Sequence, residues 1–282
     1  MNLRIGKLTY LNNLPIYYQF LNHHPYLANK HTIIEGPPRF LNQGIRKGEI
    51  DLSVVSSIEY ARNFDDYLIL PDLSISSQGP VESVLLFSRV PLEELHQRPL
   101  LVSSDSETSV ALIKIIFSQY GVEPLYMRGE IPESEQESFG FNNEFAAMLV
   151  IGDMALQLRR QCPYPYVYDL GEEWQKITGL PFVFALWIVR QEVFIRTPEL
   201  VFEVYHALIE SRNYSLGHLE EVIASVKKPA SFSPSDCLHY FQNLRFDFSS
   251  SYQKGLKMYF DFLFKQGEIP RPVRILKFMS LP

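Results

Sequence analysis

Several features of the common functional classes are missing from this sequence. Lysine and arginine never form a block longer than a pair, and the formal net charge is -6. This excludes the strongly basic surface that nucleic acid or an anionic membrane requires. No apolar run approaches the roughly 20 residues that span a bilayer, and the longest strong run extends from Pro181 to Val189. We therefore expect a partner that is neither nucleic acid nor a membrane.

Metal-binding and redox patterns are missing too. The two cysteines, Cys162 and Cys237, lack CxxC spacing, and we expect free thiols in a reducing compartment. The seven histidines form no HxxxH or HExxH pattern, so the sequence predicts no metal site. The first residues enter a strand-like pattern at once, without a signal-peptide h-region or cleavage site, which predicts a cytoplasmic protein.

No common catalytic motif stands out either. The chain has no nucleophile elbow, Walker loop, GxGxxG after a strand, or Cys-His pair at a recognisable spacing. It does have a large apolar content, because 46% of its 282 residues are hydrophobic. That content is ample for more than one domain.

Short apolar runs alternate with amphipathic helical stretches, which favours an α/β fold with largely parallel sheets. The predicted strands are Leu3 to Leu8, Thr32 to Ile34, Leu52 to Val55, Ser83 to Phe87, Leu100 to Val102, Ala147 to Ile151, Tyr166 to Tyr168 and Phe182 to Val189. The predicted helices include Ile58 to Arg62, Glu107 to Tyr120, Met154 to Arg160, Leu170 to Ile177 and a carboxy-terminal series of Pro198 to Arg212, Gly217 to Val226, Pro234 to Asn243 and Ser251 to Phe264.

Two long apolar strands have different helical neighbourhoods before and after them. They are Val81 to Arg89 and Pro181 to Arg190, and we interpret each as a crossing between lobes. The pattern predicts a discontinuous first lobe of residues 1–88 and 188–282, and an inserted second lobe of residues 89–187. A ligand would lie in the cleft between them, at the carboxyl ends of strands from both lobes.

Four predicted strand-to-helix corners carry small hydroxyls, amides and free N–H groups. They are Tyr10 to Asn13, Ser56-Ser57, Ser103 to Ser109 and Gly152-Asp153. Because the N-terminus of a helix favours negative charge, such corners together suit an anion. Each corner alone is more typical of a plain helix cap.

Individual residues at these corners keep two interpretations open. Asn13 is a good N-cap, and Ser104 with Glu107 matches the S-x-x-E capping box. Thr108 and Ser109 lie in a first turn, where they either contact a ligand or only start the helix. Asp153 is the carboxylate best placed for a cleft, but it also suits a cap.

Other polar residues are similarly ambiguous. Ser83 shares a strand face with apolar residues, so its hydroxyl meets either a ligand carboxylate or a neighbouring carbonyl. The segment from Ser74 to Pro80 is predicted to be a loop. Glu59 and Tyr60 face either the cleft or solvent. Trp174 and Trp187 are expected to be packed in the interior, like most large aromatic side chains at apolar positions.

Six motifs, in this order along almost the whole chain, carry a family resemblance. They are Tyr10 to Tyr17 (YLNNLPIY), Asp51 to Tyr60 (DLSVVSSIEY), Gly79 to Ser83 (GPVES), Thr108 to Val110 (TSV), Ile151 to Leu156 (IGDMAL), and Asp169 to Trp174 (DLGEEW) with Thr178 to Trp187 (TGLPFVFALW). The chain resembles the chorismate dehydratases of the futalosine route to menaquinone. The resemblance implies an α/β, two-lobed type II periplasmic-binding-protein-like fold with two crossover strands and a helical carboxy-terminal region, here in a cytoplasmic enzyme.

The activity that this resemblance implies is the removal of water from chorismate to give 3-[(1-carboxyvinyl)oxy]benzoate, without metal or redox cofactor. Loss of the ring proton beside the ether creates charge that delocalises onto the ring carboxylate. Oriented N–H and O–H donors are then needed more than a strong side-chain base. A carboxylate of the bound substrate could take the proton itself.

The resemblance also implies roles for particular residues. Asn12 would be the catalytic asparagine and would orient either the leaving hydroxyl or the enolpyruvyl group. Ser83 and the Thr108-Ser109 pair would hold the two carboxylates, with Ser56 and Ser57 lining the cleft. The chain departs from the family at Glu107, where arginine is frequent. This difference disfavours an electrostatic role for position 107 and favours the capping box.

Two alternatives remain at this stage. A 1,4-dihydroxy-6-naphthoate synthase of the same pathway would share the fold, but its chemistry is thought to rest on a cleft histidine, and this chain has no histidine between His96 and His206. A non-catalytic protein that binds a small anion is the other alternative. The sequence predicts a small-molecule partner and leaves the oligomeric state open.

Overall fold

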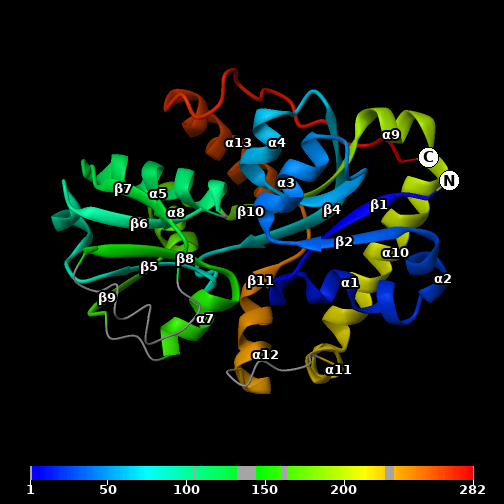
Figure 1. The fold of residues 1–282 in the computed structure, drawn as a ribbon, viewed down its shortest axis with the longest axis horizontal. Helices are drawn as coiled ribbons and strands as arrows, with labels where there is room; N and C mark the ends of the chain where they lie inside the picture. Colours follow the sequence, from blue (N-terminus) through cyan, green and yellow to red (C-terminus); the bar gives the residue numbers. More distant parts are fainter. Residues whose placement is uncertain (1, 105, 132–143, 161–163, 226–231, 282) are drawn as a thin grey trace.

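The computed structural model describes residues 2–104, 106–131, 144–160, 164–225 and 232–281. Two β-sheets form two lobes that lie side by side, and helices cover both (Figure 1). The described ends of the chain both lie in the first lobe, on the side away from the second. None of the described helices is both long enough and apolar enough to cross a membrane.

The first sheet has six strands in the order β11-β4-β10-β3-β1-β2. Their bounds are β1 (Arg4–Leu8), β2 (Thr32–Gly36), β3 (Leu52–Ser56), β4 (Tyr67–Ser77), β10 (Phe182–Arg190) and β11 (Leu244–Arg245). The helices of the first lobe that precede β10 are η1 (Leu11–Asn13), α1 (Leu14–Asn22), α2 (Pro25–Lys30), α3 (Pro38–Arg46) and α4 (Ser57–Arg62).

The second sheet has five strands in the order β7-β6-β8-β5-β9. Its strands are β5 (Val84–Ser88), β6 (Pro99–Ser103), β7 (Leu125–Gly129), β8 (Ala147–Ile151) and β9 (Tyr166–Asp169). The helices of this lobe are η2 (Leu92–Leu95), α5 (Glu107–Tyr120), α7 (Gly152–Arg160) and α8 (Leu170–Thr178).

Both sheets mix parallel and antiparallel pairs, so the prediction of largely parallel sheets is wrong. Strand β1 runs parallel to β2 and β3, and β6 runs parallel to β7 and β8. The remaining pairs, which involve β4, β5 and β10, are antiparallel. Strand β10, which follows the second connection between the sheets, runs antiparallel to both of its neighbours, β3 and β4.

The change of sheet does not coincide with the predicted lobe boundaries. Residues 84–88 pair with β8 and β9 of the second sheet, and Phe182–Arg190 pairs within the first sheet. The connections between the sheets are therefore residues 78–83 and 179–181, which overlap only the first residues of the two long apolar segments. These strands were predicted to cross between the lobes, but each of them belongs to one sheet.

Strand β4 is the longest strand, and part of it was predicted to be a loop. Its sequence contains Pro71 and ends in Ser74 to Ser77, residues that are unusual in strand interiors. The pairing of β4 with β10 has register shifts, and Asp72 within β4 has a positive φ of 54°. The irregular pairing accommodates Pro71, one of the residues that made this segment resemble a loop in the sequence.

The carboxy-terminal region contains the predicted helices and a short additional one, Gln191–Arg196. They are α9 (Gln191–Arg196), α10 (Pro198–Gly217), α11 (Leu219–Ala224), α12 (Pro234–Asn243) and α13 (Ser250–Lys265). Helix α10 packs along α1 in the first lobe, whereas α13 contacts both β10 and α5 and so touches both lobes (Figure 1). The carboxy-terminal region therefore helps to hold the two lobes together.

Both tryptophans are fully buried, as predicted. Trp187 on β10 packs beside Tyr17 of α1, with ring centroids 6.5 Å apart. Trp174 on α8 donates its indole N–H to the carbonyl of Pro181 at 3.2 Å, next to the second connection between the sheets. Trp174 thus anchors that connection, and Trp187 belongs to the core of the first lobe.

Candidate active site

A partly open cavity lies between the two sheets. Both lobes contribute to its walls. The lining residues are Leu8, Tyr10, Asn12, Pro38, Val55, Ser56, Ile75, Val81, Ser83, Val84, Ser106, Thr108, Ser109, Ile151, Gly152, Phe184 and Ala185. None of these described residues carries a charged side chain.

Four helical N-termini meet at this cavity. They belong to η1, α4, α5 and α7, and each follows the carboxyl end of a strand from β1, β3, β6 or β8. A helix N-terminus presents free N–H groups and a partial positive charge. The predicted meeting of the four corners is thus present, and the cavity can hold an anion without a cationic side chain.

Asn12 lines the cavity from η1. Its Oδ1 is buried and has no hydrogen-bond partner among the described residues. Next to it, Asn13 occupies the predicted N-cap position of α1 but does not cap it through its side chain, because its amide donates to Leu8 O at 3.2 Å. Asn12 is thus the member of the pair that faces the cavity.

Ser83 also lines the cavity, on the connection that enters the second sheet. Its Oγ accepts a hydrogen bond from the phenol of Tyr240 at 2.9 Å and lies 3.4 Å from Val81 O. Both earlier interpretations therefore fit the geometry. The hydroxyl has a protein carbonyl nearby, yet that bond is long and leaves its proton available to a ligand.

The two serines before α4 differ in their surroundings. Ser56 lines the cavity and exchanges hydrogen bonds with Asn42, whose amide donates to Ser56 Oγ at 2.9 Å and whose Oδ1 accepts from Ser56 N at 3.2 Å. Ser57 does not line it, contrary to expectation, because its hydroxyl is directed at Val183 O of β10 at 2.6 Å. Ser57 joins α4 to the first sheet instead.

The start of α5 differs from the predicted capping box. Ser106, not Ser104, is the N-cap, and its Oγ accepts from Ser109 N at 3.3 Å. Thr108 and Ser109 line the cavity as expected. Thr108 Oγ1 accepts the N–H of Ile58 on α4 at 3.1 Å, so its own hydroxyl proton is oriented away from Ile58. A hydrogen bond between the lobes thus forms directly beside the cavity.

Asp153 does not line this cavity, although it lies at the start of α7 as predicted. Its carboxylate accepts the N–H of Leu11 in η1, with Oδ1 at 3.0 Å and Oδ2 at 3.3 Å. Burial raises the pKa of Asp153, and the hydrogen bond from Leu11 opposes that rise. The preceding Gly152 has φ of 67°, a conformation that disfavours a side chain. Asp153 therefore bonds the second lobe to the helical turn that carries Asn12.

A second buried aspartate holds the connections between the sheets. Asp169 accepts the N–H groups of Val81 at 3.0 Å, Glu82 at 2.6 Å and Gly171 at 2.9 Å. A Cβ at Gly171 would lie 2.5 Å from Gly79 O, so only glycine allows this approach. Glu82 has φ of 64°, an unusual conformation outside glycine. The contacts fix the connection on which Ser83 lies.

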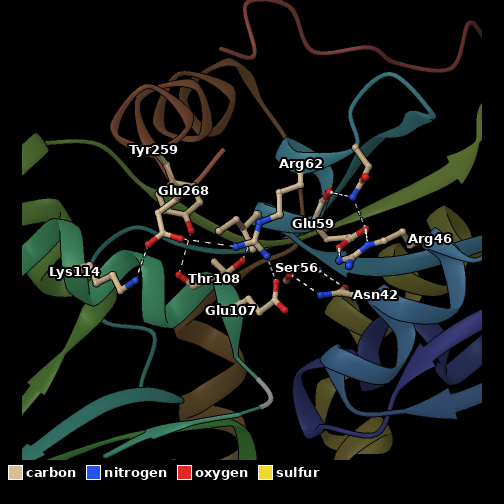
Figure 2. A network of polar contacts seen from close by, with 12 residues as sticks. Asn42, Arg46, Ser56, Glu59, Arg62, Glu107, Thr108, Lys114, Tyr259 and Glu268 are labelled. Atoms are coloured by element: carbon tan, nitrogen blue, oxygen red, sulfur yellow. Dashed lines mark hydrogen bonds and ion pairs between the residues drawn. The ribbon is translucent and has the colours of Figure 1, made fainter. Parts of the chain in front are cut away.

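Charged side chains form a separate network outside the cavity (Figure 2). Arg62 of α4 pairs with Glu107 of α5 and lies 3.8 Å from Glu268, and Lys114 pairs with Glu268 at 2.6 Å. Glu107 therefore has an electrostatic partner in the other lobe, and its expected capping-box role is wrong. The acid at this position pairs with Arg62, so it does not face the cavity as an unpaired charge.

Glu59 and Tyr60 face neither the cavity nor solvent. The carboxylate of Glu59 is fully buried, pairs with Arg46, and accepts from Asn63 at 2.9 Å and Tyr67 at 3.0 Å (Figure 2). Burial raises the pKa of Glu59, and the guanidinium of Arg46 opposes that rise. Tyr60 is buried and accepts the N–H of Lys277 at 2.9 Å. Both residues therefore stabilise the first lobe.

Several cavity residues were not predicted to be functional. Tyr10 was part of a predicted corner, but its side chain forms a wall against Gly152, where a Cβ would lie 3.1 Å from the ring. Phe184 and Ala185 come from a strand that was predicted to cross between the lobes, but neither residue was predicted to line the cavity. Tyr240 reaches Ser83 from α12, far along the chain. No local pattern in the sequence marks it.

No group of three or more His, Cys, Asp or Glu side chains in the described part of the chain is arranged to hold a metal ion. Of the two cysteines, Cys237 is buried, and Cys162 lies outside the described residues. The residues around the cavity thus offer hydroxyls, amides and helix N-termini as their chemistry.

Comparison with known proteins gives relatives along nearly the entire chain. A chorismate dehydratase of Thermus thermophilus is 30% identical over 270 residues, which cover 90% of this chain and 93% of that protein. A chorismate dehydratase of Campylobacter jejuni is 32% identical over 184 residues, or 64% of each chain. Both names agree with the resemblance that the six motifs indicated.

Solved structures agree with the fold. A protein of Archaeoglobus fulgidus matches with a TM-score of 0.75 at 17% identity, covering 95% of this chain and 98% of that one. The periplasmic aliphatic sulphonate binding protein of Escherichia coli matches with a TM-score of 0.67 at 13% identity, covering 96% and 94%. The predicted periplasmic-binding-protein-like fold is confirmed. A family model described as menaquinone biosynthesis matches residues 3–265, and this chain therefore belongs to the menaquinone biosynthesis family.

Proposed function

We propose that this protein is a chorismate dehydratase, a carbon–oxygen hydro-lyase that converts chorismate to 3-[(1-carboxyvinyl)oxy]benzoate and water in the futalosine route to menaquinone. The observation that carries the proposal is the uncharged cavity at which four helical N-termini meet. The family membership and the names of the two relatives support the same reaction.

The reaction needs one proton and one hydroxyl to leave the ring. The C–H bond beside the ether breaks, and its electron pair delocalises through the ring double bond onto the ring carboxylate. The C–O bond to the ring hydroxyl then breaks, water leaves and the ring becomes aromatic. Negative charge thus grows on the ring carboxylate, which the cavity can surround with N–H and O–H donors. These donors stabilise the transition state more than the bound substrate, because the carboxylate is more negative in the transition state.

The residues that line the cavity have distinct roles in this proposal. Thr108 and Ser109 at the start of α5 hold one carboxylate, and Ser83 holds the other. Ser56, fixed by Asn42, presents the N-terminus of α4. Asn12 orients the ring substituents. Because no carboxylate or imidazole lines the cavity among the described residues, a carboxylate of the substrate takes the proton.

Ser57 and Asp153 have supporting roles in this proposal rather than direct contact with substrate. Ser57 joins α4 to β10, and Asp153 joins α7 to η1. Both therefore fix a helix N-terminus beside the cavity. Chorismate is the only small-molecule partner that the proposal requires, with no cofactor, and a cytoplasmic location is part of the same proposal.

Incubation of the purified protein with chorismate, without additives, tests the function. We expect mass spectrometry to show a product that has lost one water and kept the enolpyruvyl group. Unchanged chorismate from folded protein would contradict the proposal and favour a non-catalytic anion-binding protein. Turnover of a cyclic futalosine derivative instead would favour the naphthoate synthase, for which the cavity would have to work without a lining histidine.

A further inference from the structure

Asn42 is a buried polar residue that lies behind the wall of the cavity. It belongs to α3, one helical turn after Pro38, which lines the cavity, and only 3% of its surface is exposed. Its carboxamide reaches Ser56 (Figure 2). Asn42 Oδ1 lies 3.2 Å from Ser56 N, and Asn42 Nδ2 lies 2.9 Å from Ser56 Oγ. The carboxamide thus holds one hydroxyl of the cavity through both of its polar atoms.

The directions of these two hydrogen bonds follow from the chemistry of the groups. A backbone N–H can only donate, so the amide oxygen of Asn42 must be the atom that faces Ser56 N. The amide nitrogen then faces Ser56 Oγ and, because it too can only donate, the hydroxyl oxygen must accept. Ser56 keeps its single hydroxyl proton, which no described residue accepts. That proton is available to a ligand in the cavity, which Ser56 lines.

Thr108, which comes from the other lobe, has a hydroxyl of the same polarity. Its Oγ1 accepts the N–H of Ile58 at 3.1 Å, and this backbone group can only donate. Among the described residues, none accepts the hydroxyl proton of Thr108. Each lobe therefore supplies the cavity with a hydroxyl that the protein has set as a donor. Two such donors suit an oxygen that carries no proton, such as a carboxylate oxygen.

We propose that Asn42 is a positioning residue that sets the hydroxyl of Ser56 as a donor, so that Ser56 and Thr108 together bind one carboxylate of the substrate. This inference rests on the proposed function, in which Thr108 and Ser109 hold that carboxylate. It adds Ser56 to the direct contacts of the substrate, and it requires an amide at position 42. A carboxylate there would accept the hydroxyl proton of Ser56 and leave only lone pairs for the ligand.

Calorimetric binding of the product benzoate tests the inference without turnover, because the product keeps both carboxylates. We expect Ser56→Ala to raise its dissociation constant about 10-fold, since one hydrogen bond to a charged group is lost. Asn42→Ala should raise the constant about 3- to 10-fold. The double variant should stay within about 2-fold of Ser56→Ala, because Asn42 acts through the hydroxyl that Ser56→Ala removes. Two effects that multiply would overturn the inference.

Asn42→Asp tests the polarity itself with a side chain of almost the same size. It keeps an acceptor for Ser56 N but has no N–H to offer, so the hydroxyl of Ser56 donates to it and not to the ligand. We expect the dissociation constant of the product to rise at least about 10-fold, and to rise less in the Ser56→Ala background. The control is Gln43→Glu, which adds the same charge at an exposed position of α3 and should change the constant less than about 2-fold.

The outcomes distinguish the inference from the function on which it rests. A wild type that converts chorismate, with an Asn42→Asp variant that binds the product as tightly as Gln43→Glu, overturns only the role of Asn42. This holds even if Asn42→Ala cannot be obtained folded. A wild type that binds the product but leaves chorismate unchanged overturns the proposed function, while coupling between Asn42 and Ser56 would still support the positioning role. A wild type that does neither overturns both.

Discussion

The cavity and the charged network beside it occupy the same two helices but differ completely in chemistry. At the start of α5, Thr108 lines the uncharged cavity, whereas the adjacent Glu107 pairs with Arg62 outside it (Figure 2). At α4, the N-cap Ser56 lines the cavity, whereas the last residue of the helix is Arg62. Adjacent residues thus contribute to two different kinds of contact between the lobes.

The difference bears on the proposed function, in which the cavity holds an anion without a cationic side chain. The arginines and lysines near the cavity already have acidic partners, including Arg46 with Glu59 and Lys114 with Glu268. The remaining positive potential comes from backbone N–H groups, whose positions are set by the helices. Such groups need no reorganisation when charge shifts during the reaction, which suits stabilisation of a transition state.

The largest expected effect comes from a substitution in the cavity. Asn12→Ala should lower kcat/KM for chorismate by about 10²- to 10³-fold, since a fixed polar group at the reacting ring is lost. The fold should persist, as monitored by circular dichroism. Asn22→Ala is a suitable control, because the amide of Asn22 donates to Tyr18 O at 2.8 Å within its own helix, α1. Near-wild-type turnover by Asn12→Ala would refute its role.

Substitutions in the charged network should lower the stability of the fold instead of the activity. Glu59→Ala should lower the free energy of unfolding by about 3 kcal/mol, because a fully buried carboxylate and its partners Arg46, Asn63 and Tyr67 are separated. Glu107→Ala is the matched comparison. Its side chain is 25% exposed, so we expect a loss of only about 1 kcal/mol. Denaturant titration measures both, and equal losses would argue against the importance of burial.

A smaller effect on binding should follow from Ser83→Ala. Losing one hydrogen bond to a charged group should raise KM about 10-fold, equivalent to about 1.4 kcal/mol. The control is Ser88→Ala, since the buried hydroxyl of Ser88 donates to Val90 O at 2.7 Å within the second lobe. Unchanged affinity of Ser83→Ala for chorismate would contradict the proposed carboxylate contact.

The smallest expected effect is a pH dependence at the bond between Asp153 and Leu11. Burial raises the pKa of Asp153 above its value in the unfolded chain, so its contribution to stability is fully present below the unfolded pKa and is lost as pH rises through the folded pKa. The side chain of Asp153→Asn does not titrate, so the variant does not lose this stability as the pH rises. Its stability relative to the wild type should therefore increase from about pH 4 towards neutral pH, as thermal unfolding at several pH values would measure. A difference independent of pH would contradict the assignment.

Much of the architecture could be predicted from local patterns. The helices Glu107–Tyr120 and Pro234–Asn243 have the predicted bounds, because apolar periodicity and end signals such as Ser233 and Gly121 act over a few residues. Strand β4 was missed because Pro71 and its serines resemble a loop. Its long pairing with β10 is a contact between distant segments, which local patterns do not contain.

The sequence by itself determined the family, the alternation of strands and helices, and the four corners that supply Asn12, Ser56, Thr108 and Gly152 to one cavity, because each depends on residues close together in the chain. Only the tertiary structure decided how those residues are partnered. Tyr240 reaches Ser83 across 157 positions, and Arg62 pairs with Glu107 across the lobes. Burial and packing select such contacts between distant residues, and no spacing within the sequence records them.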